Sequence, residues 1–242
     1  MKKIYLALLC MATLMSSCSF IGIGGKMKDI EDGADPDYDK YPGMNVNTEP
    51  LKGRAFVLPA GIEIENIIYG EGNQREEENQ DASLAITDDM LGSGLCVIVN
   101  FNIKNVTDKN IDVTFPAGLM LQAAETSYQN GILVKDVNLT VVANTTRRIS
   151  MRFYCLNSHA SASSPSAMYG LSYITDIAAF QPLFNVCAVK RVNIDEYKAL
   201  SILKYYSTCA LVQEIVWAIT QGKTFTEEEI RGFLNKVKAS KD

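Results

Sequence analysis

The sequence contains little of what several classes of protein require. It has one histidine among 242 residues, which excludes a metal centre built from several histidines. Its 23 lysines and arginines are outnumbered by 28 acidic residues, and this balance argues against a nucleic-acid partner. The sequence also lacks a phosphate-binding loop, a dinucleotide-binding fingerprint and a metal-ligand cluster. We therefore expect no metal, no cofactor and no nucleic acid.

The first apolar run is too short to cross a membrane. It covers the eleven residues 4–14 and follows Lys2 and Lys3. A helix that spans a bilayer about 30 Å thick needs roughly 20 residues. A positive start followed by a short apolar run is typical of a secretory signal peptide. We assign residues 1–17 to this signal.

Small residues stand directly before a cysteine at the end of this run, in the segment Leu14-Met15-Ser16-Ser17-Cys18. The segment resembles the lipobox of bacterial lipoproteins. The resemblance implies cleavage before Cys18 and attachment of palmitate-type acyl chains to it. Several acyl chains hold a protein on a membrane far better than one. The resemblance thus implies a membrane anchor in the bacterial cell envelope, at the outer membrane, on either its periplasmic or its surface face. The alternative is an ordinary signal peptide with an incidental cysteine.

Residues 18–50 combine glycine with clustered acidic residues. Glycine adds flexibility to a chain, and like charges extend it. We therefore predict that residues 18–50 comprise the lipidated Cys18 and a flexible acidic tether.

Residues 51–156 show the alternation of apolar and polar side chains that is typical of β-strands. Every second residue from Leu95 to Ile103 is apolar, and so is every second residue from Ile149 to Cys155. About seven short strands separated by turns predict an immunoglobulin-like antiparallel β-sandwich.

The pattern changes in residues 171–242, which follow a serine-rich loop at residues 157–170. Apolar residues between 194 and 222 recur at helical spacing, and Gly222 suits a helix end. The segment Thr226-Glu227-Glu228-Glu229 predicts a capping box that opens a last helix. We therefore expect an α+β fold, a β-sandwich followed by a helical C-terminal region.

Four cysteines remain after the signal and Cys18, namely Cys96, Cys155, Cys187 and Cys209. Export permits disulfides, and four cysteines allow three pairings, which the sequence leaves open.

Cys155 and Gln213 each lie in an apolar segment with an aromatic residue nearby. The two segments, Phe153-Tyr154-Cys155-Leu156 and residues 211–217, resemble the motifs of bacterial surface thioester domains. The resemblance implies attack of the cysteine sulfur on the glutamine carboxamide, loss of ammonia, and later capture of a partner. Such a bond needs a thiolate and a dry pocket, to which Trp217 is a candidate contributor. The alternative is that Cys155 is a core residue or disulfide partner and that Gln213 caps a strand edge.

His159 follows Cys155 by four residues, and a Cys–His pair can activate a nucleophile. It is therefore a candidate accessory residue. However, it lies in the serine-rich loop without an assigned acidic partner, and the sequence has no Gly-x-Ser-x-Gly elbow. The pattern favours an exposed loop histidine.

Taken together, the sequence predicts a membrane-anchored envelope lipoprotein with a binding or structural role and no catalysis. Its partners would be membrane lipid, through acylated Cys18, and an unspecified protein or glycan. The alternative function is that of an adhesin-like protein that binds covalently through Cys155 and Gln213. A Cys-dependent hydrolase is a weaker third candidate.

Overall fold

A computed structural model describes residues 36–72, 86–200 and 202–240. The predicted signal peptide, Cys18 and the first part of the predicted tether lie outside the described residues.

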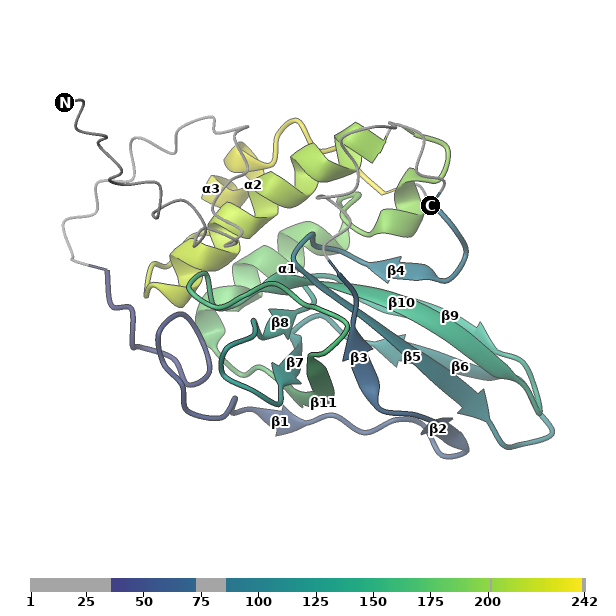
Figure 1. The fold of residues 1–242 in the computed structure, drawn as a ribbon. Coiled ribbons are helices and arrows are strands. Elements are labelled where there is room, and N and C mark those ends of the chain that lie inside the picture. The colour runs from purple at the N-terminus through teal and green to yellow at the C-terminus, as the bar shows by residue number, and fades with distance from the viewer. Residues whose placement is uncertain (1–35, 73–85, 201, 241–242) are drawn as a thin grey trace, which may run out of the picture.

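Six antiparallel strands close on themselves to form a barrel (Figure 1). The ring runs in the order β5 (Val97–Asn105), β3 (Ile68–Gly70), β11 (Met168–Ile174), β7 (Leu119–Ala123), β8 (Gly131–Ile132) and β10 (Thr146–Cys155). It closes where β10 pairs with β5 over eight residue pairs. The alternation seen in the sequence sets the faces, because Val97, Val99 and Phe101 are buried while Asn100 is half-buried.

Five further strands extend or accompany the barrel. They are β1 (Arg54–Ala55), β2 (Ile62–Ile64), β4 (Met90–Gly92), β6 (Ile111–Phe115) and β9 (Val137–Val141). The first three pair with β11, β5 and β10, and β4 runs parallel to β10. Strands β6 and β9 form a separate antiparallel pair.

The predicted immunoglobulin-like sandwich is therefore wrong. A sandwich has two sheets with open edges, whereas this ring has no open edge between β5 and β10. Alternation shows which side chains face inward, but it does not specify which strands pair. Strand β11 bridges β3 and β7, and it lies in residues that we assigned to the serine-rich loop and the helical region.

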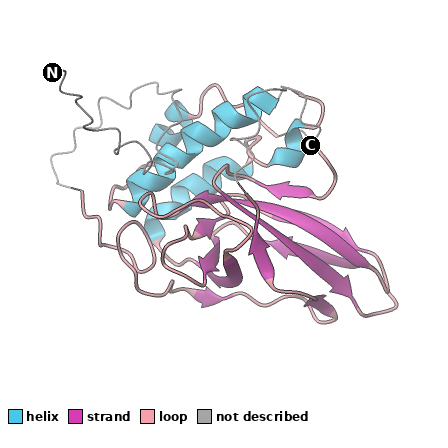
Figure 2. Cartoon of the chain, viewed as in Figure 1, coloured by secondary structure: helices cyan, strands magenta, loops and turns pink. Residues whose placement is uncertain are grey.

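The helices pack together on one side of the strands (Figure 2). They are the 3-10 helices η1 (Ala178–Phe180) and η2 (Ile194–Tyr197) and the α-helices α1 (Gln181–Ala188), α2 (Ile202–Thr220) and α3 (Glu227–Phe233). The capping box predicted at Thr226 is confirmed, since its hydroxyl accepts the Glu229 N–H and Glu229 Oε2 accepts the Thr226 N–H at 2.7 Å. No helix in the described ranges is long and apolar enough to cross a membrane.

One continuous apolar core joins the barrel to the helices. Phe153 and Tyr154 of β10 and Val212 of α2 are fully buried in it. The core also includes Met44, from the described part of the predicted tether. There the Asn45 N–H donates to the Leu156 carbonyl at 2.8 Å. Residues 36–50 therefore lie against the domain.

Candidate functional site

The fold brings Cys155 and Gln213 into direct contact. Cys155 ends β10, Gln213 lies in the middle of α2, and both are buried. Gln213 Oε1 accepts the Cys155 backbone N–H at 2.9 Å, and Gln213 Nε2 donates to the Cys155 carbonyl at 2.8 Å. The carboxamide is thus bonded to the backbone of the cysteine.

The Gln213 side chain bonds the backbone groups of Cys155 that would otherwise pair with a neighbouring strand. The ladder between β10 and β5 ends at the pair Phe153 and Val97, so Cys155 lies beyond it. On the other edge, Cys155 lies opposite Gly131 of β8. An amide offers one donor and one acceptor, the same groups that a neighbouring strand would supply. This is the strand-edge cap that the sequence left open as an alternative.

The environment of the Cys155 thiol opposes nucleophilic chemistry. Burial raises the pKa of Cys155 to about 12, while the Trp217 indole and the Asn157 backbone act in the opposite direction. The Trp217 Nε1 makes no well-formed hydrogen bond to the described residues. A thiol with so high a pKa is protonated at neutral pH, and the thiolate is the reactive form. The geometry therefore favours a structural role for the pair.

The cysteines do not form the disulfides that were open from the sequence. Cys155, Cys187 and Cys209 are free and buried, so none of the three pairings of the four cysteines is formed. Cys155 is therefore bonded to neither Cys187 nor Cys209.

His159 lies on a polar groove of about 470 Å³. We define the polar groove by the residues that line it, which come from 43–49, 122–130 and 157–161. Its lining is dominated by asparagine, glutamine, serine and threonine, with Glu49 as the single carboxylate and with neither lysine nor arginine. His159 is exposed there.

Two asparagines hold the three segments of the polar groove together. The Gly43 carbonyl accepts Asn130 Nδ2 at 2.8 Å and Asn157 Nδ2 at 2.9 Å. Asn157 Oδ1 in turn accepts the Asn130 N–H at 2.8 Å, and Asn130 Oδ1 accepts the Ala123 N–H at 2.8 Å. The walls are therefore fixed by side-chain bonds to backbone, and both amides are used in this way.

Asn45 lines the same groove, but its amide is not bonded to other described residues. Its side chain is 5% exposed, yet neither its Nδ2 nor its Oδ1 has a hydrogen-bond partner in the described part of the chain. Its backbone is left-handed, with φ 52°, a conformation that asparagine tolerates better than most residues. A buried polar group left unpaired costs about 1–3 kcal/mol. Asn45 therefore carries hydrogen-bonding capacity at the groove wall that the fold itself does not use.

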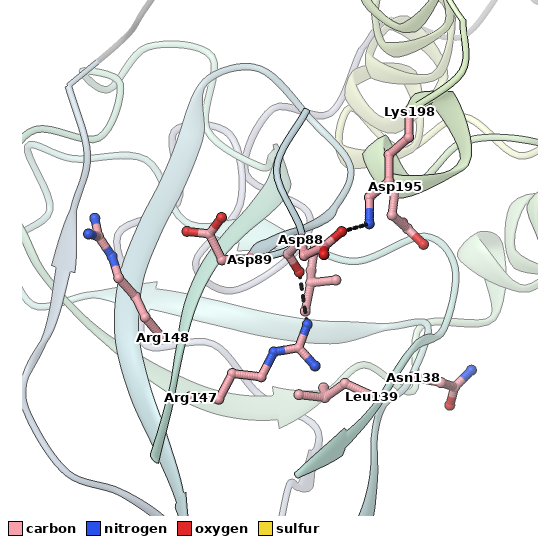
Figure 3. A pocket seen from close by; sticks show the side chains of 9 residues that line it. Asp88, Asp89, Asn138, Leu139, Arg147, Arg148, Asp195 and Lys198 are labelled. Atoms are coloured by element: carbon pink, nitrogen blue, oxygen red, sulfur yellow. Dashed lines mark hydrogen bonds and ion pairs between the residues drawn. The ribbon is translucent and has the colours of Figure 1, made fainter. Parts of the chain in front are cut away.

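A second cleft, of about 630 Å³, carries charges of both signs (Figure 3). Its lining includes three aspartates and three basic residues. Lys198 Nζ lies 2.6 Å from Asp88 Oδ1, and this ammonium holds the pKa of Asp88 below its usual value. Arg147 Nη2 donates to the Asp88 carbonyl at 2.8 Å. The charges offset each other, so this cleft does not favour a ligand of one sign.

Within the described ranges, no three histidine, cysteine, aspartate or glutamate side chains gather so as to hold a metal ion. No protein-family model, curated relative or solved structure matches the chain. Functional inference therefore rests on the residues themselves.

Sequence reasoning did not single out three of the four asparagines that line the polar groove. Asn45, Asn130 and Asn157 lie in three separate polar segments, and none belongs to a motif. The one local signal is that Asn157 follows a buried strand by two residues, a position where a polar side chain can reach the end of a sheet.

Proposed function

We propose that this protein is a membrane-anchored lipoprotein of the bacterial cell envelope that binds a neutral glycan in the polar groove. The lipobox-like segment that ends in Cys18 supports the anchor and an outer-membrane location. The observation that carries the binding role is the unpaired amide of Asn45 in a groove lined by amides and hydroxyls.

The chemistry of the lining selects the class of ligand. Sugar hydroxyls both donate and accept hydrogen bonds, and amide and hydroxyl side chains do the same. The groove has no lysine or arginine to pair with a phosphate or carboxylate. Its apolar lining consists of Val46, Ala123, Ala160 and the ring of Tyr128. A neutral, hydroxyl-rich ligand fits these groups best.

The binding role is tested with the full chain and a panel of chitotriose, maltotriose, cellotriose and mannotriose, by titration calorimetry. We expect at least one to bind. Replacing Asn45→Gly removes the amide while glycine accepts the positive φ without strain. We expect this variant to bind at least about tenfold more weakly, in line with the loss of one or two buried hydrogen bonds.

Asn144→Gly is the matched control, because Asn144 also has a positive φ, 54°, but is exposed and does not line the groove. It should bind like the unchanged protein. Absence of binding across the whole panel, or equal binding by Asn45→Gly, would contradict the proposal.

The anchor is tested separately. Mass spectrometry of the N-terminal peptide from native membranes should show acyl chains on Cys18, and Cys18→Ala should release the protein from membranes. A native N-terminus elsewhere, or an unmodified Cys18, would rule out the anchor.

A thioester-forming covalent binder is the second candidate, because Cys155 and Gln213 are in contact. A thioester lowers the intact mass by one ammonia and lets methylamine add to the protein. Since the Gln213 amide is bonded to the Cys155 backbone, we expect neither change. Detecting both would favour the covalent function over the glycan-binding one.

A further inference from the structure

A third hollow, of about 460 Å³, combines positive charge with an apolar floor. We call it the basic cleft. Lys204, Ser207, Thr208 and Leu211 of α2 form one wall, since their spacing places them on one helix face. Residues 191–200 and 236–238 supply the rest of its lining.

Four cations line the basic cleft, and no acidic residue does. They are Arg191, Lys204, Lys236 and Lys238. None of the four is ion-paired with a carboxylate of the described residues, although the chain as a whole carries a net charge of -5. Like charges gathered without a counter-charge repel one another, so the cleft favours an anion.

The floor is apolar because its polar groups are already bonded within the protein. Leu200, Leu211 and Val237 lie there with the ring of Tyr197. The Tyr197 hydroxyl donates to the Arg191 carbonyl at 2.7 Å and lies 2.8 Å from Thr208 Oγ1. On the helix wall, the Ser207 hydroxyl donates to the Leu203 carbonyl at 2.9 Å. Little hydrogen-bonding capacity remains for a peptide backbone, whereas a hydrocarbon needs none.

We propose that the basic cleft binds a single-chain amphiphile with an anionic head group, of the fatty-acid type. The hydrocarbon chain of the ligand would lie on the apolar floor, and its carboxylate would lie among the four cations. A concave cleft of this volume fits one such molecule better than the flat surface of a bilayer. Its cations and floor residues do not line the polar groove, so this proposal is independent of glycan binding.

The segment that carries two of the cations is fixed through backbone groups. Arg191 N–H donates to the Lys238 carbonyl at 2.9 Å, and Lys190 Nζ donates to the Val237 carbonyl at 2.8 Å. The Lys236 and Lys238 side chains are exposed. Changing them should therefore alter the charge of the cleft without unfolding the protein.

The experiment is titration calorimetry of the full chain, purified without detergent, with laurate below its micelle concentration. We expect one site, with affinity rising about fourfold for each methylene from octanoate to laurate. Dodecyl octaethylene glycol ether, which has a dodecyl chain and a neutral head group without sugar, should bind at least about tenfold more weakly.

The charge-reversal pair Lys236→Glu/Lys238→Glu should weaken laurate binding by about tenfold or more, and the milder pair Lys236→Gln/Lys238→Gln by less. Lys109→Glu is the control, because Lys109 is exposed in the turn between β5 and β6 and does not line the cleft. Melting curves check that each variant folds. Equal binding of the neutral amphiphile, unchanged binding in both lysine pairs, or binding to anionic phosphatidylglycerol vesicles without binding of free laurate would each overturn the proposal.

Discussion

The polar groove and the basic cleft are built in opposite ways. In the groove, Asn130 and Asn157 bond three chain segments together, and the lining carries one carboxylate and no cation. In the cleft, four cations on long side chains surround an apolar floor. Fixed walls select a ligand by hydrogen-bond geometry, whereas flexible charges select it by sign and apolar area. One small domain thus presents two hollows that favour chemically different ligands.

The largest effect should come from Gln213→Leu, which leaves the N–H and carbonyl of Cys155 buried and unpaired. At about 1–3 kcal/mol for each of the two groups, we expect a loss of about 2–6 kcal/mol in the free energy of unfolding. Urea denaturation measures it. Because Asn157 follows Cys155 by two residues, glycan binding should weaken more than laurate binding.

Gln122→Leu is the control for stability, because the Gln122 side chain makes no hydrogen bond with the described residues and is only half-buried. It should change the free energy of unfolding by less than about 0.5 kcal/mol, as surface substitutions usually do. Equal losses in the two variants would show that Gln213 does not act as a strand-edge cap.

Alkaline pH tests how the buried thiols near the two hollows contribute to stability. Cys155 lies two residues before the groove residue Asn157, and Cys209 directly follows the cleft residue Thr208 in α2. Burial raises the pKa of both thiols. A thiol whose pKa is raised on folding stabilises the protein fully below its unfolded pKa of about 9. That stability is lost as the pH rises above it. For Cys155, whose pKa is raised to about 12, we expect the free energy of unfolding to fall by about 1 kcal/mol between pH 9 and pH 10, and for Cys209 we expect a fall in the same direction.

Denaturant curves at pH 8, 9 and 10 measure this slope, and Cys155→Ala and Cys209→Ala should each reduce it. Native protein should also resist iodoacetamide at pH 8 at both positions until it is unfolded. Rapid labelling of only one thiol would show that the region around it opens to solvent, contrary to this expectation.

Salt should produce the smallest effect and should separate the two hollows. Raising sodium chloride from 0.05 M to 0.5 M screens exposed charges, so laurate binding should weaken by about threefold to tenfold. Glycan binding in the polar groove should stay within about twofold, since neutral ligands are little affected by screening. Calorimetry at the two salt concentrations measures both ligands, and an equal response would mean that charge does not distinguish them.

Local features of the fold could be predicted from the sequence, but its closure could not. The alternation around Val97 and Phe153 marks β5 and β10, and the Thr226 capping box marks the start of α3. The ring also includes the two-residue strand β8 and the strand β11, which carries no clear alternation. Pairing between distant strands depends on tertiary contacts rather than on a local pattern.

The candidate sites, too, could be predicted from the sequence only in part. The resemblance to thioester domains singled out Cys155 and Gln213, and the fold places them in contact, but through the backbone of the cysteine. The Asn45 amide and the cations of the basic cleft had no sequence signal, because their environment is formed by segments far apart in the chain. Only the folded arrangement shows that a polar atom is unpaired.

The most direct test of the account is a crossed titration. The protein, Asn45→Gly and the pair Lys236→Glu/Lys238→Glu are each titrated with the tightest oligosaccharide of the panel and with laurate. The two-site proposal predicts that Asn45→Gly weakens binding of only the oligosaccharide and that the lysine pair weakens binding of only laurate, each by about tenfold or more. Loss of both ligands in one variant, or of neither ligand in both variants, would contradict it.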